Sequence, residues 1–383
     1  MTSTLTEPTG RVHWLGTGLS TGSGLALVCA TATGTTVWGR SREKAQACLD
    51  RLGLTGQADA RELGWEALAD AVRPGDLVVS MLPAAEHPTV LRLCLRQSAH
   101  FASSSYVSAE VAELAADARR AGLVVLTDAG LDPGIDHLLA HRLVQAAEKA
   151  LGDTPATVSF TSYCGSFPAV PNDFRYRFSW APRGVLTALG TPARFVEGGR
   201  ELTVDRPYRA AEKLVLGGEP FEVYANRDSI PYITTYQFPK SWEVDTFVRG
   251  TVRLDGWTDA WQPVFAQLEN GTADEITALA ARLAEQYPAT SEDHDRVVMF
   301  VRLEAVTGDG ARWAGEYTMD VQGDATENAT PRLVSVALAG GLAELLAGRL
   351  SPGLHQATSD PGSIDSWLDF LSANGVACQE YLP

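Results

Sequence analysis

The chain has 383 residues and a formal net charge of −16, with 45% hydrophobic and 20% charged residues. This indicates a globular protein of about two domains, and the negative field disfavours nucleic acid and anionic membranes as partners. No apolar run reaches the roughly 18 to 20 residues of a membrane helix, and the polar start MTSTLTEPTGR lacks signal-peptide features, so we expect a cytoplasmic protein. Five cysteines without CxxC spacing argue against disulfides or structural zinc.

Strands alternate with helices through the first part of the chain. The apolar runs are RVHWL, TTVWG, DLVVSML, HFAS and LVVLT, and helix-patterned segments such as EKAQACLDRLG, HPTVLRLCLRQSA and AEVAELAADARRAG lie between them. This alternation predicts an α/β fold with a Rossmann-type, doubly wound parallel sheet. Because ligands bind beyond the carboxyl ends of such strands, the loops after these runs are the candidate site.

The loop after the first strand carries an imperfect dinucleotide-binding pattern. Gly16 and Gly18 have the expected spacing, but Thr21 stands at the third position and Gly22 comes one residue late. An ordinary strand-to-helix turn would look the same. The loop nevertheless opens a helix whose amino-terminal amides can hold a pyrophosphate, so cofactor binding is the functional interpretation.

The residues after the second strand indicate which nicotinamide cofactor fits. NAD enzymes usually carry an acidic residue there, whereas this chain has Arg40, Ser41 and Arg42. Two arginines and a hydroxyl suit a 2′-phosphate, so NADP is predicted over NAD. The alternative is that both arginines are solvated residues at the start of the next helix.

The stretch AGLDPGIDH follows the buried-looking run LVVLT. Pro133 and Gly134 predict a tight corner, which places Asp132 near a strand end, although Asp also often caps a helix. Asp136 and His137 begin the next helix and are expected to have a supporting role. His137 and His141 have helical spacing without the glutamate of HExxH, so no metal site is predicted and surface packing is expected.

The remainder of the chain has a different pattern. Residues 139–330 contain Thr-, Tyr-, Phe- and Val-rich strands, a hairpin turning at 308–310 and helices near 184–189 and 273–286, which predict an α+β substrate-binding domain with a mixed or antiparallel sheet. Residues 331–383 read as a helical segment, with a long apolar helix over 332–350, that packs back on the dinucleotide-binding domain formed by 1–138. A homodimer is expected.

Several blocks resemble the glutamate-forming saccharopine dehydrogenase (saccharopine reductase) family. They are VVSMLPAAEHP, SSSYVS, AGLDPGIDH, SYCG, RYRFSWAPRGVL, YANRDS and VRGTVRLDGW. The resemblance implies NADP-dependent interconversion of saccharopine with glutamate and α-aminoadipate semialdehyde. Expected cofactor contacts are Gly16, Gly18, Leu19, Ser20, Arg40, Ser41, Met81, Leu82 and Pro83. The chain departs from the family in its loop GTGLSTGSG and at Arg175, where the family carries glycine.

Saccharopine carries three carboxylates, so its pocket needs arginines in an otherwise acidic protein. By resemblance, the expected substrate contacts are Ser105, Tyr106, Asp132, Arg227, Arg249, Thr251 and Arg253, and the expected catalytic residues are Asp132, Tyr106 and Cys164. Strand alternation predicts that the side chains at 249, 251 and 253 share one sheet face. The alternative for these side chains is a solvated face whose arginines pair with Asp245 and Asp255. The alternatives for the function are a related enzyme of the lysine 6-dehydrogenase, opine or carboxyspermidine type, or a cofactor-binding scaffold without turnover.

Overall fold

The computed structural model describes residues 4–178, 182–288, 290 and 293–383, and its contacts divide the chain into two compact units. Unit 1 comprises Met1–Leu138 and Pro331–Val376, and unit 2 comprises Leu139–Thr330 and Ala377–Pro383. The C-terminal segment expected at 331–383 is therefore divided, because its last seven residues, 377–383, belong to unit 2. There the edge strand β16 (Gln379–Tyr381) pairs with β14 (Arg312–Gln322).

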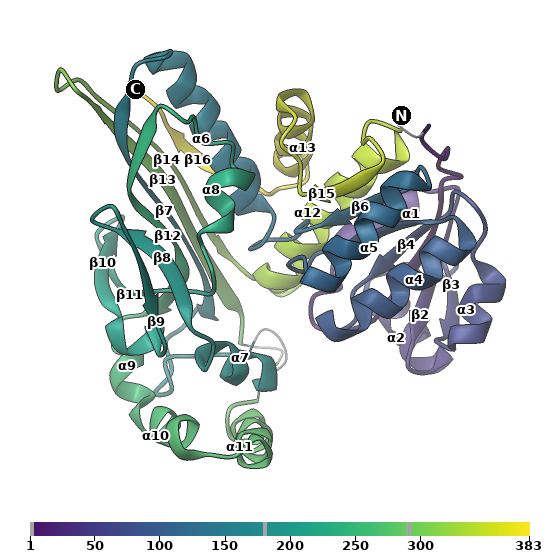
Figure 1. Cartoon of the computed structure of the whole chain (residues 1–383). Coiled ribbons are helices and arrows are strands. Elements are labelled where there is room, and N and C mark those ends of the chain that lie inside the picture. Colours follow the sequence, from purple (N-terminus) through teal and green to yellow (C-terminus); the bar gives the residue numbers. More distant parts are fainter. Residues whose placement is uncertain (1–3, 179–181, 289, 291–292) are drawn as a thin grey trace. The chain divides into compact units, whose positions relative to one another are not determined.

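Unit 1 is built on a seven-stranded sheet with the order β3-β2-β1-β4-β5-β6-β15 (Figure 1). Its strands are β1 (Arg11–Leu15), β2 (Gly34–Gly39), β3 (Asp59–Glu62), β4 (Leu77–Ser80), β5 (His100–Ser103), β6 (Val124–Thr127) and β15 (Gly353–Gln356). Every neighbouring pair is parallel. The predicted Rossmann-type sheet is confirmed, with its order reversing at β1, between β4 and β2.

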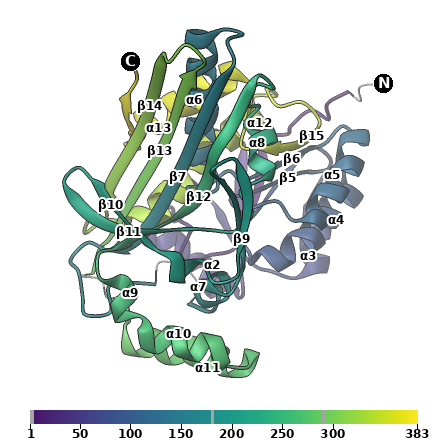
Figure 2. The same ribbon diagram turned by 60° about the vertical axis from the view of Figure 1, so that its left-hand side comes forward.

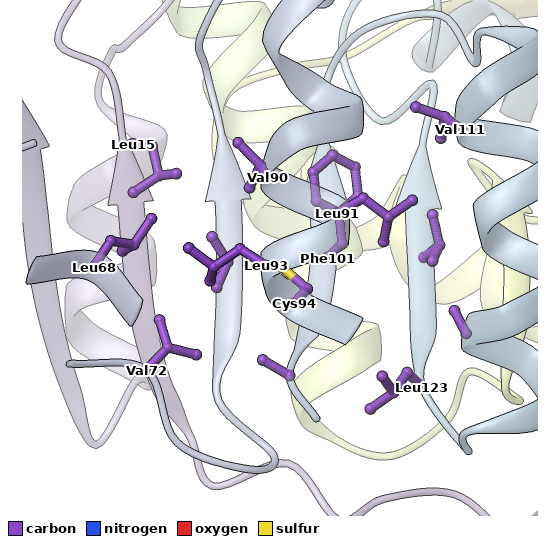
Figure 3. Packing of buried hydrophobic residues seen from close by; sticks show 14 of the residues in the cluster. Leu15, Leu68, Val72, Val90, Leu91, Leu93, Cys94, Phe101, Val111 and Leu123 are labelled. Carbon is purple, nitrogen blue, oxygen red and sulfur yellow. The ribbon is translucent and has the colours of Figure 1, made fainter. Parts of the chain in front are cut away.

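The helices of unit 1 cover both faces of this sheet. They are α1 (Gly24–Thr31), α2 (Arg42–Arg51), α3 (Trp65–Ala71), the short 3₁₀ turn η1 (Ala84–Glu86), α4 (His87–Gln97), α5 (Ala109–Arg120) and the start of α6 (Ile135–Leu151). Strands β1, β2, β4, β5 and β6 share one hydrophobic core with α3, α4 and α5, in which Leu15, Phe101 and Val111 are almost fully buried (Figure 3). The central strands have near-continuous apolar sequences because both of their faces are covered by helices.

The C-terminal part of unit 1 contributes a strand as well as helices. Helix α12 (Ala329–Leu346) corresponds to the predicted long helix, and α13 (Pro361–Ala373) lies in the rest of the segment that was predicted to be helical. Between them β15 pairs with β6 in parallel, which the sequence analysis did not predict. Helix α12 is long and apolar enough to cross a membrane, but 72% of that window is buried inside the protein. Its apolar surface is thus a core surface.

Unit 2 contains a nine-stranded mixed sheet in which β12 and β7 are parallel and all other pairs are antiparallel. Its strands, besides β14 and β16, are β7 (Ala156–Pro168), β8 (Ala193–Glu197), β9 (Arg200–Val204), β10 (Glu212–Leu216), β11 (Glu219–Ala225), β12 (Trp242–Leu254) and β13 (Asp295–Thr307). The hairpin predicted around 308–310 joins β13 to β14. Figure 2 shows the long strands β12, β7, β13 and β14 side by side.

Short helices and a large aromatic cluster complete unit 2. The helices are α7 (Pro182–Leu189), η2 (Pro207–Ala210), α8 (Pro231–Thr235), α9 (Trp257–Ala260), α10 (Gln262–Asn270) and α11 (Ala273–Gln286). Phe174, Tyr176, Tyr224, Trp257 and Trp261 meet in one buried cluster that α7, α10 and α11 also line. Helix α11 starts at a capping box in which Thr272 and Glu275 satisfy each other's backbone amides, as its sequence TADE favours.

Candidate active site

The loops at the carboxyl edge of the unit 1 sheet carry the predicted cofactor contacts. Because all seven strands are parallel, the segments after Leu15, Gly39, Ser80, Ser103 and Thr127 emerge at one edge. The strand order reverses at β1, so its loop lies at the topological switch point where open α/β sheets bind dinucleotides.

Close internal contacts fix the shape of the loop after β1. Gly16 has a φ of +114°, and a Cβ there would lie 2.9 Å from the carbonyl oxygen of Met81, whereas a Cβ at Gly18 would meet nothing within 4 Å. Thr21 is 1% exposed, and its hydroxyl donates to the Gly16 carbonyl at 3.2 Å and accepts from Trp14 Nε1 at 3.3 Å. Thr21, which stands at the third position of the glycine pattern, therefore stabilises the loop through two hydrogen bonds.

Gly24 allows a close contact between two helices. It begins α1, and a Cβ at this position would overlap the backbone carbonyl of Ser335 in α12. Its amide also donates to the Ser335 hydroxyl at 2.9 Å. Helix α1 therefore packs closely against a helix from the C-terminal segment at this position.

The segment after β2 fits a phosphate. Ser41 caps α2, because its hydroxyl accepts from the Lys44 amide at 3.3 Å. Arg40 and Arg42 are exposed, and within the described parts of the chain neither forms an ion pair or a side-chain hydrogen bond. These residues lie at the start of a helix and are exposed, as the alternative expected, and their contact with a 2′-phosphate stays a prediction. Leu19 is also exposed, at 59%.

Met81, Leu82 and Pro83 lead from β4 into η1 at the same edge. The Ser104 hydroxyl donates to Met81 Sδ at 3.8 Å, which joins this loop to the one after β5. Behind the loop, His87 Nδ1 lies 3.0 Å from Ser80 Oγ, and the imidazole is 2% exposed. Burial lowers the pKa of His87 from 6.5 to about 4.

The depressed pKa of His87 predicts a specific acid sensitivity. The unfolded chain binds a proton near the ordinary pKa of 6.5, whereas the folded chain does so only near 4, so stability is lost as the pH falls through this interval. We expect the wild type to lose about 3 kcal/mol more than His87→Gln between pH 7 and pH 4, measured by urea unfolding. His294→Gln, at a histidine with no such burial, is the control. Parallel pH profiles for wild type and His87→Gln would contradict this.

Tyr106 and Asp132 come together as a pair. The Tyr106 hydroxyl donates to Asp132 Oδ1 at 2.7 Å, and both side chains are half-buried. Tyr106 follows β5 and Asp132 follows β6, so neighbouring strands deliver them. Ser105, predicted beside them, is held by its backbone: its amide donates to Ser103 Oγ at 3.1 Å, and its carbonyl accepts from the Asp128 amide at 2.9 Å.

The turn that carries Asp132 is compact. The Gly130 amide donates to the Pro133 carbonyl at 2.8 Å, and a Cβ at Gly134 would overlap the backbone of Gly130. The Asp132–Pro133 peptide bond is cis. The same turn packs against Ser104, 3.0 Å from where a Gly130 Cβ would lie. These close approaches explain the two glycines of the segment GLDPG.

The expectation that His137 and His141 pack on the surface is wrong. They are 0% and 2% exposed. Asp136 and Asp128 are also fully buried, and His137 lies between them, 3.7 Å from Asp128 Oδ1 and 3.8 Å from Asp136 Oδ2. Sequence reasoning missed Asp128; its signal was an acid placed directly after a buried strand, one residue before AGLDPGIDH.

In unit 2 the three residues predicted to share a face do so. Strand β12 pairs in continuous register with β11 and β7 from Phe247 onward, so Arg249, Thr251 and Arg253 alternate onto one face. Cys164 of β7 is the register partner of Thr251 and lies on the same face, 8% exposed. Four of the expected site residues thus line one patch of this sheet.

Arg253 lies in an aromatic box. It is 9% exposed, and its guanidinium carbon lies 5.0 Å from the ring of Tyr176, 5.3 Å from Trp257 and 5.7 Å from Tyr224. It donates to the Tyr224 hydroxyl at 3.0 Å, and no carboxylate of the described residues forms an ion pair with it. Asp255, the expected partner of a solvated face, instead binds Lys213. A buried guanidinium without an acidic partner is typical of a site for an anionic ligand, and such a role for Arg253 stays a prediction.

Arg249 and Arg227 belong to adjoining segments. Arg249 is 4% exposed, with its guanidinium carbon 4.1 Å from the Tyr232 ring. Its carbonyl accepts from the Asn226 amide at 2.8 Å, and its amide donates to Ser229 Oγ at 3.0 Å, so β12 is bonded to both ends of the NRDS turn. Arg227 is exposed at the tip of that turn with a φ of +58°.

Unit 2 contains two further arginines near the aromatic cluster, Arg177 and Arg175. Arg177 is 7% exposed, and within the described residues no ion pair holds it, a feature that sequence reasoning did not identify. Arg175 has a φ of +55°, a left-handed conformation that glycine adopts without strain, which explains the glycine expected there by resemblance. Residues 179–181 of the RYRFSWAPRGVL block lie outside the described residues.

Comparison with known proteins gives consistent matches. The model of the saccharopine dehydrogenase NADP binding domain matches residues 12–126, and that of the saccharopine dehydrogenase C-terminal domain matches residues 130–376. Saccharopine dehydrogenase [NADP(+), L-glutamate-forming] of Schizosaccharomyces pombe is 36% identical over 58% of this chain and 50% of that protein. The enzyme of the same name from Pyricularia oryzae is 41% identical over 50% of this chain and 42% of that protein. These alignments span about half the length of the relatives.

Solved structures agree on the fold. The apo saccharopine dehydrogenase (L-Glu forming) from Saccharomyces cerevisiae has a TM-score of 0.80 and 25% identity, covering 97% of this chain and 99% of that one. A homospermidine synthase from Legionella pneumophila in complex with NAD has a TM-score of 0.64 and 11% identity, covering 98% and 92%, which shows the fold alone. The resemblance inferred from the sequence blocks is confirmed. The chain belongs to the saccharopine dehydrogenase family.

Proposed function

We propose that the protein is an NADP-dependent oxidoreductase of lysine metabolism that interconverts saccharopine with glutamate and α-aminoadipate semialdehyde. The observation that carries this proposal is the Tyr106–Asp132 hydrogen bond at the carboxyl edge of a Rossmann-type sheet. The names of the aligned relatives and the match to the yeast enzyme over 97% of this chain support it.

Asp132 is the proposed proton-handling group. In the reductive direction an amine and an aldehyde lose water to form an imine; hydride addition to its carbon and protonation of its nitrogen then give the secondary amine. The nicotinamide supplies the hydride when it is bound. In this direction a protonated Asp132 can donate the proton to the nitrogen, and in the oxidative direction its carboxylate can accept that proton, because the Tyr106 hydroxyl donates to one of its oxygens and holds its orientation.

The arginines of unit 2 are the proposed carboxylate receptors. Arg253 is the strongest candidate, because it is a buried guanidinium with aromatic neighbours and no acidic partner within the described structure. Arg249 and Arg227 lie in segments that are bonded to each other, which suits the several carboxylates of saccharopine. Thr251 and Cys164 would line the same patch, and Cys164 is proposed as a small polarisable wall there.

Cofactor choice tests Arg40 and Arg42. Replacing both with alanine should raise the NADPH dissociation constant roughly 10- to 100-fold and leave that of NADH within about twofold, because only NADPH has a phosphate to lose contact with. Fluorescence titration measures both constants. Arg92→Ala, which breaks an exposed ion pair with Glu110 on another helix, should change neither. Equal weakening of NADPH and NADH binding would show that these arginines do not contact the 2′-phosphate.

The activity itself is tested by a substrate panel. Purified protein is assayed by nicotinamide absorbance with NADP or NAD and with saccharopine, lysine, or glutamate plus the semialdehyde. The proposal expects turnover with saccharopine and NADP. Turnover of lysine alone would assign a related dehydrogenase instead, and cofactor binding without any turnover would indicate a scaffold.

We also propose a homodimer in a reducing compartment, the cytoplasm. None of the five cysteines, all of which lie in described parts of the chain, forms a disulfide, which is typical of such a compartment. Thr157 of the central strand β7 is exposed, and Ser159 and Thr161 are only half-buried, so this face of the sheet is open to a second copy. Light scattering should give twice the 41.0 kDa mass of one chain; a monomer mass would refute the dimer.

A further inference from the structure

We propose that His137 is a positioning residue that keeps Tyr106 and Asp132 in hydrogen-bonding register, an inference that rests on the function proposed above for that pair. Tyr106 and Asp132 belong to different connections, one after β5 and one after β6. Their 2.7 Å hydrogen bond therefore depends on how these two loops are held relative to each other. Three buried side chains, those of Asp128, His137 and Asp136, hold them.

Asp128 holds the loop that carries Tyr106. Its amide donates to the Ser105 carbonyl at 2.9 Å, and its Oδ2 accepts from the Val107 amide at 3.3 Å. These two contacts bracket Tyr106 on both sides. Asp128 itself has a φ of +52° and receives the Thr127 hydroxyl on Oδ2 at 2.8 Å, so its carboxylate orientation is set at the end of β6.

Asp136 holds the turn that carries Asp132. Its Oδ1 accepts from the Gly134 amide at 2.7 Å, two residues beyond Asp132. The turn is closed on its other side by the hydrogen bond from the Gly130 amide to the Pro133 carbonyl. A shift of the Asp136 carboxylate would therefore release one end of the turn.

His137 lies between the two carboxylates. Each carboxylate uses one oxygen for its loop and turns the other towards the imidazole: Asp128 Oδ1 is 3.7 Å from Nε2, and Asp136 Oδ2 is 3.8 Å from Nδ1. All three side chains are 0% exposed. Both separations are longer than a hydrogen bond, so the imidazole is a polar spacer between two buried carboxylates, and an apolar side chain in its place would leave both carboxylates facing hydrocarbon. Without it, both carboxylates must reorient, and both loops move with them.

A fluorine label on Tyr106 tests this independently of turnover. With 3-fluorotyrosine incorporated at position 106, Asp132→Ala defines the ¹⁹F resonance of the broken hydrogen bond. We expect His137→Leu to move the resonance at least halfway from the wild-type position to that of Asp132→Ala. A His137→Leu resonance at the wild-type position would overturn the proposal. If that variant does not fold, His137→Gln is used, and it should move the resonance in the same direction by less.

His100→Gln is the matched control. His100 is also fully buried in unit 1, but its ring nitrogens contact the Thr6 carbonyl and the Val124 amide, so its loss should lower stability and leave the Tyr106 resonance in place. A resonance that moves equally in both variants would indicate general loosening and refute a specific role.

Kinetics add a second readout. His137→Leu should lower kcat about tenfold with the NADPH dissociation constant within twofold, and should lower it less than twofold further in an Asp132→Ala background. Equal losses in both backgrounds would count against the coupling. If the wild type turns over no saccharopine while the fluorine result holds, the proposed reaction fails and the positioning role stands.

Discussion

Asp132→Asn should lower kcat about 100- to 1000-fold while leaving the NADPH dissociation constant within about twofold. The substitution preserves size and an oxygen that can accept from the Tyr106 hydroxyl, but it removes the negative charge and the basicity of the carboxylate. Loss of a positioned proton acceptor affects the chemical step, whereas cofactor binding depends on other loops of the same sheet edge. Steady-state kinetics with saccharopine and fluorescence titration with NADPH measure the two quantities.

Two further variants define this prediction. Tyr106→Phe removes only the hydroxyl that orients Asp132, so a smaller loss of about tenfold is expected, and the double variant should be little worse than Asp132→Asn alone. Asp117→Asn changes an exposed aspartate of α5 that pairs with Arg120 and should leave kcat unchanged. If Asp132→Asn retains more than a tenth of the wild-type kcat, Asp132 is a turn residue and not the proton-handling group.

Gly24→Ala should destabilise unit 1 by at least about 3 kcal/mol, which corresponds to a fall of roughly 10 °C in its melting temperature. The added Cβ would overlap the Ser335 carbonyl, and the overlapped atoms are backbone atoms of α12, which cannot rotate away. To relieve the overlap, α1 must separate from α12 and lose the hydrogen bond from the Gly24 amide to Ser335 Oγ. Calorimetry of wild type and variant measures the shift.

Gly34→Ala is the matched control, because a Cβ at Gly34 would meet nothing within 4 Å and its backbone is not in the left-handed region. Its melting temperature should stay within about 2 °C of the wild type. A Gly24→Ala protein that melts with the wild type would mean that α1 and α12 are not in this close contact. The prediction concerns packing, so the loss should appear with and without NADPH.

The alternating pattern of the first 138 residues predicted β1, β2, β4, β5 and β6, because strands buried on both faces leave continuous apolar runs in the sequence. It did not predict the edge strand β3, whose sequence DARE is largely exposed and polar. The hairpin of β13 and β14 was equally visible, since two alternating runs flank a glycine-containing turn. Strand β15 was not visible: GLHQ is short and half-polar, and it becomes a strand only because β6 offers it a free edge.

The candidate site divides along the same line. Sequence by itself determined that Asp132 lies on a turn after a strand, that arginines follow β2, and that the residues at 249, 251 and 253 share a face, because these depend on local turn chemistry and strand period. Tertiary structure alone decided that Tyr106 meets Asp132, that Arg253 is buried without an acid, that Gly24 serves α12, and that His137 lies between Asp128 and Asp136. Each of these is a contact between segments that are distant along the chain, or an environment that packing creates. Contacts and environments of this kind leave no periodic pattern or fixed spacing in the sequence.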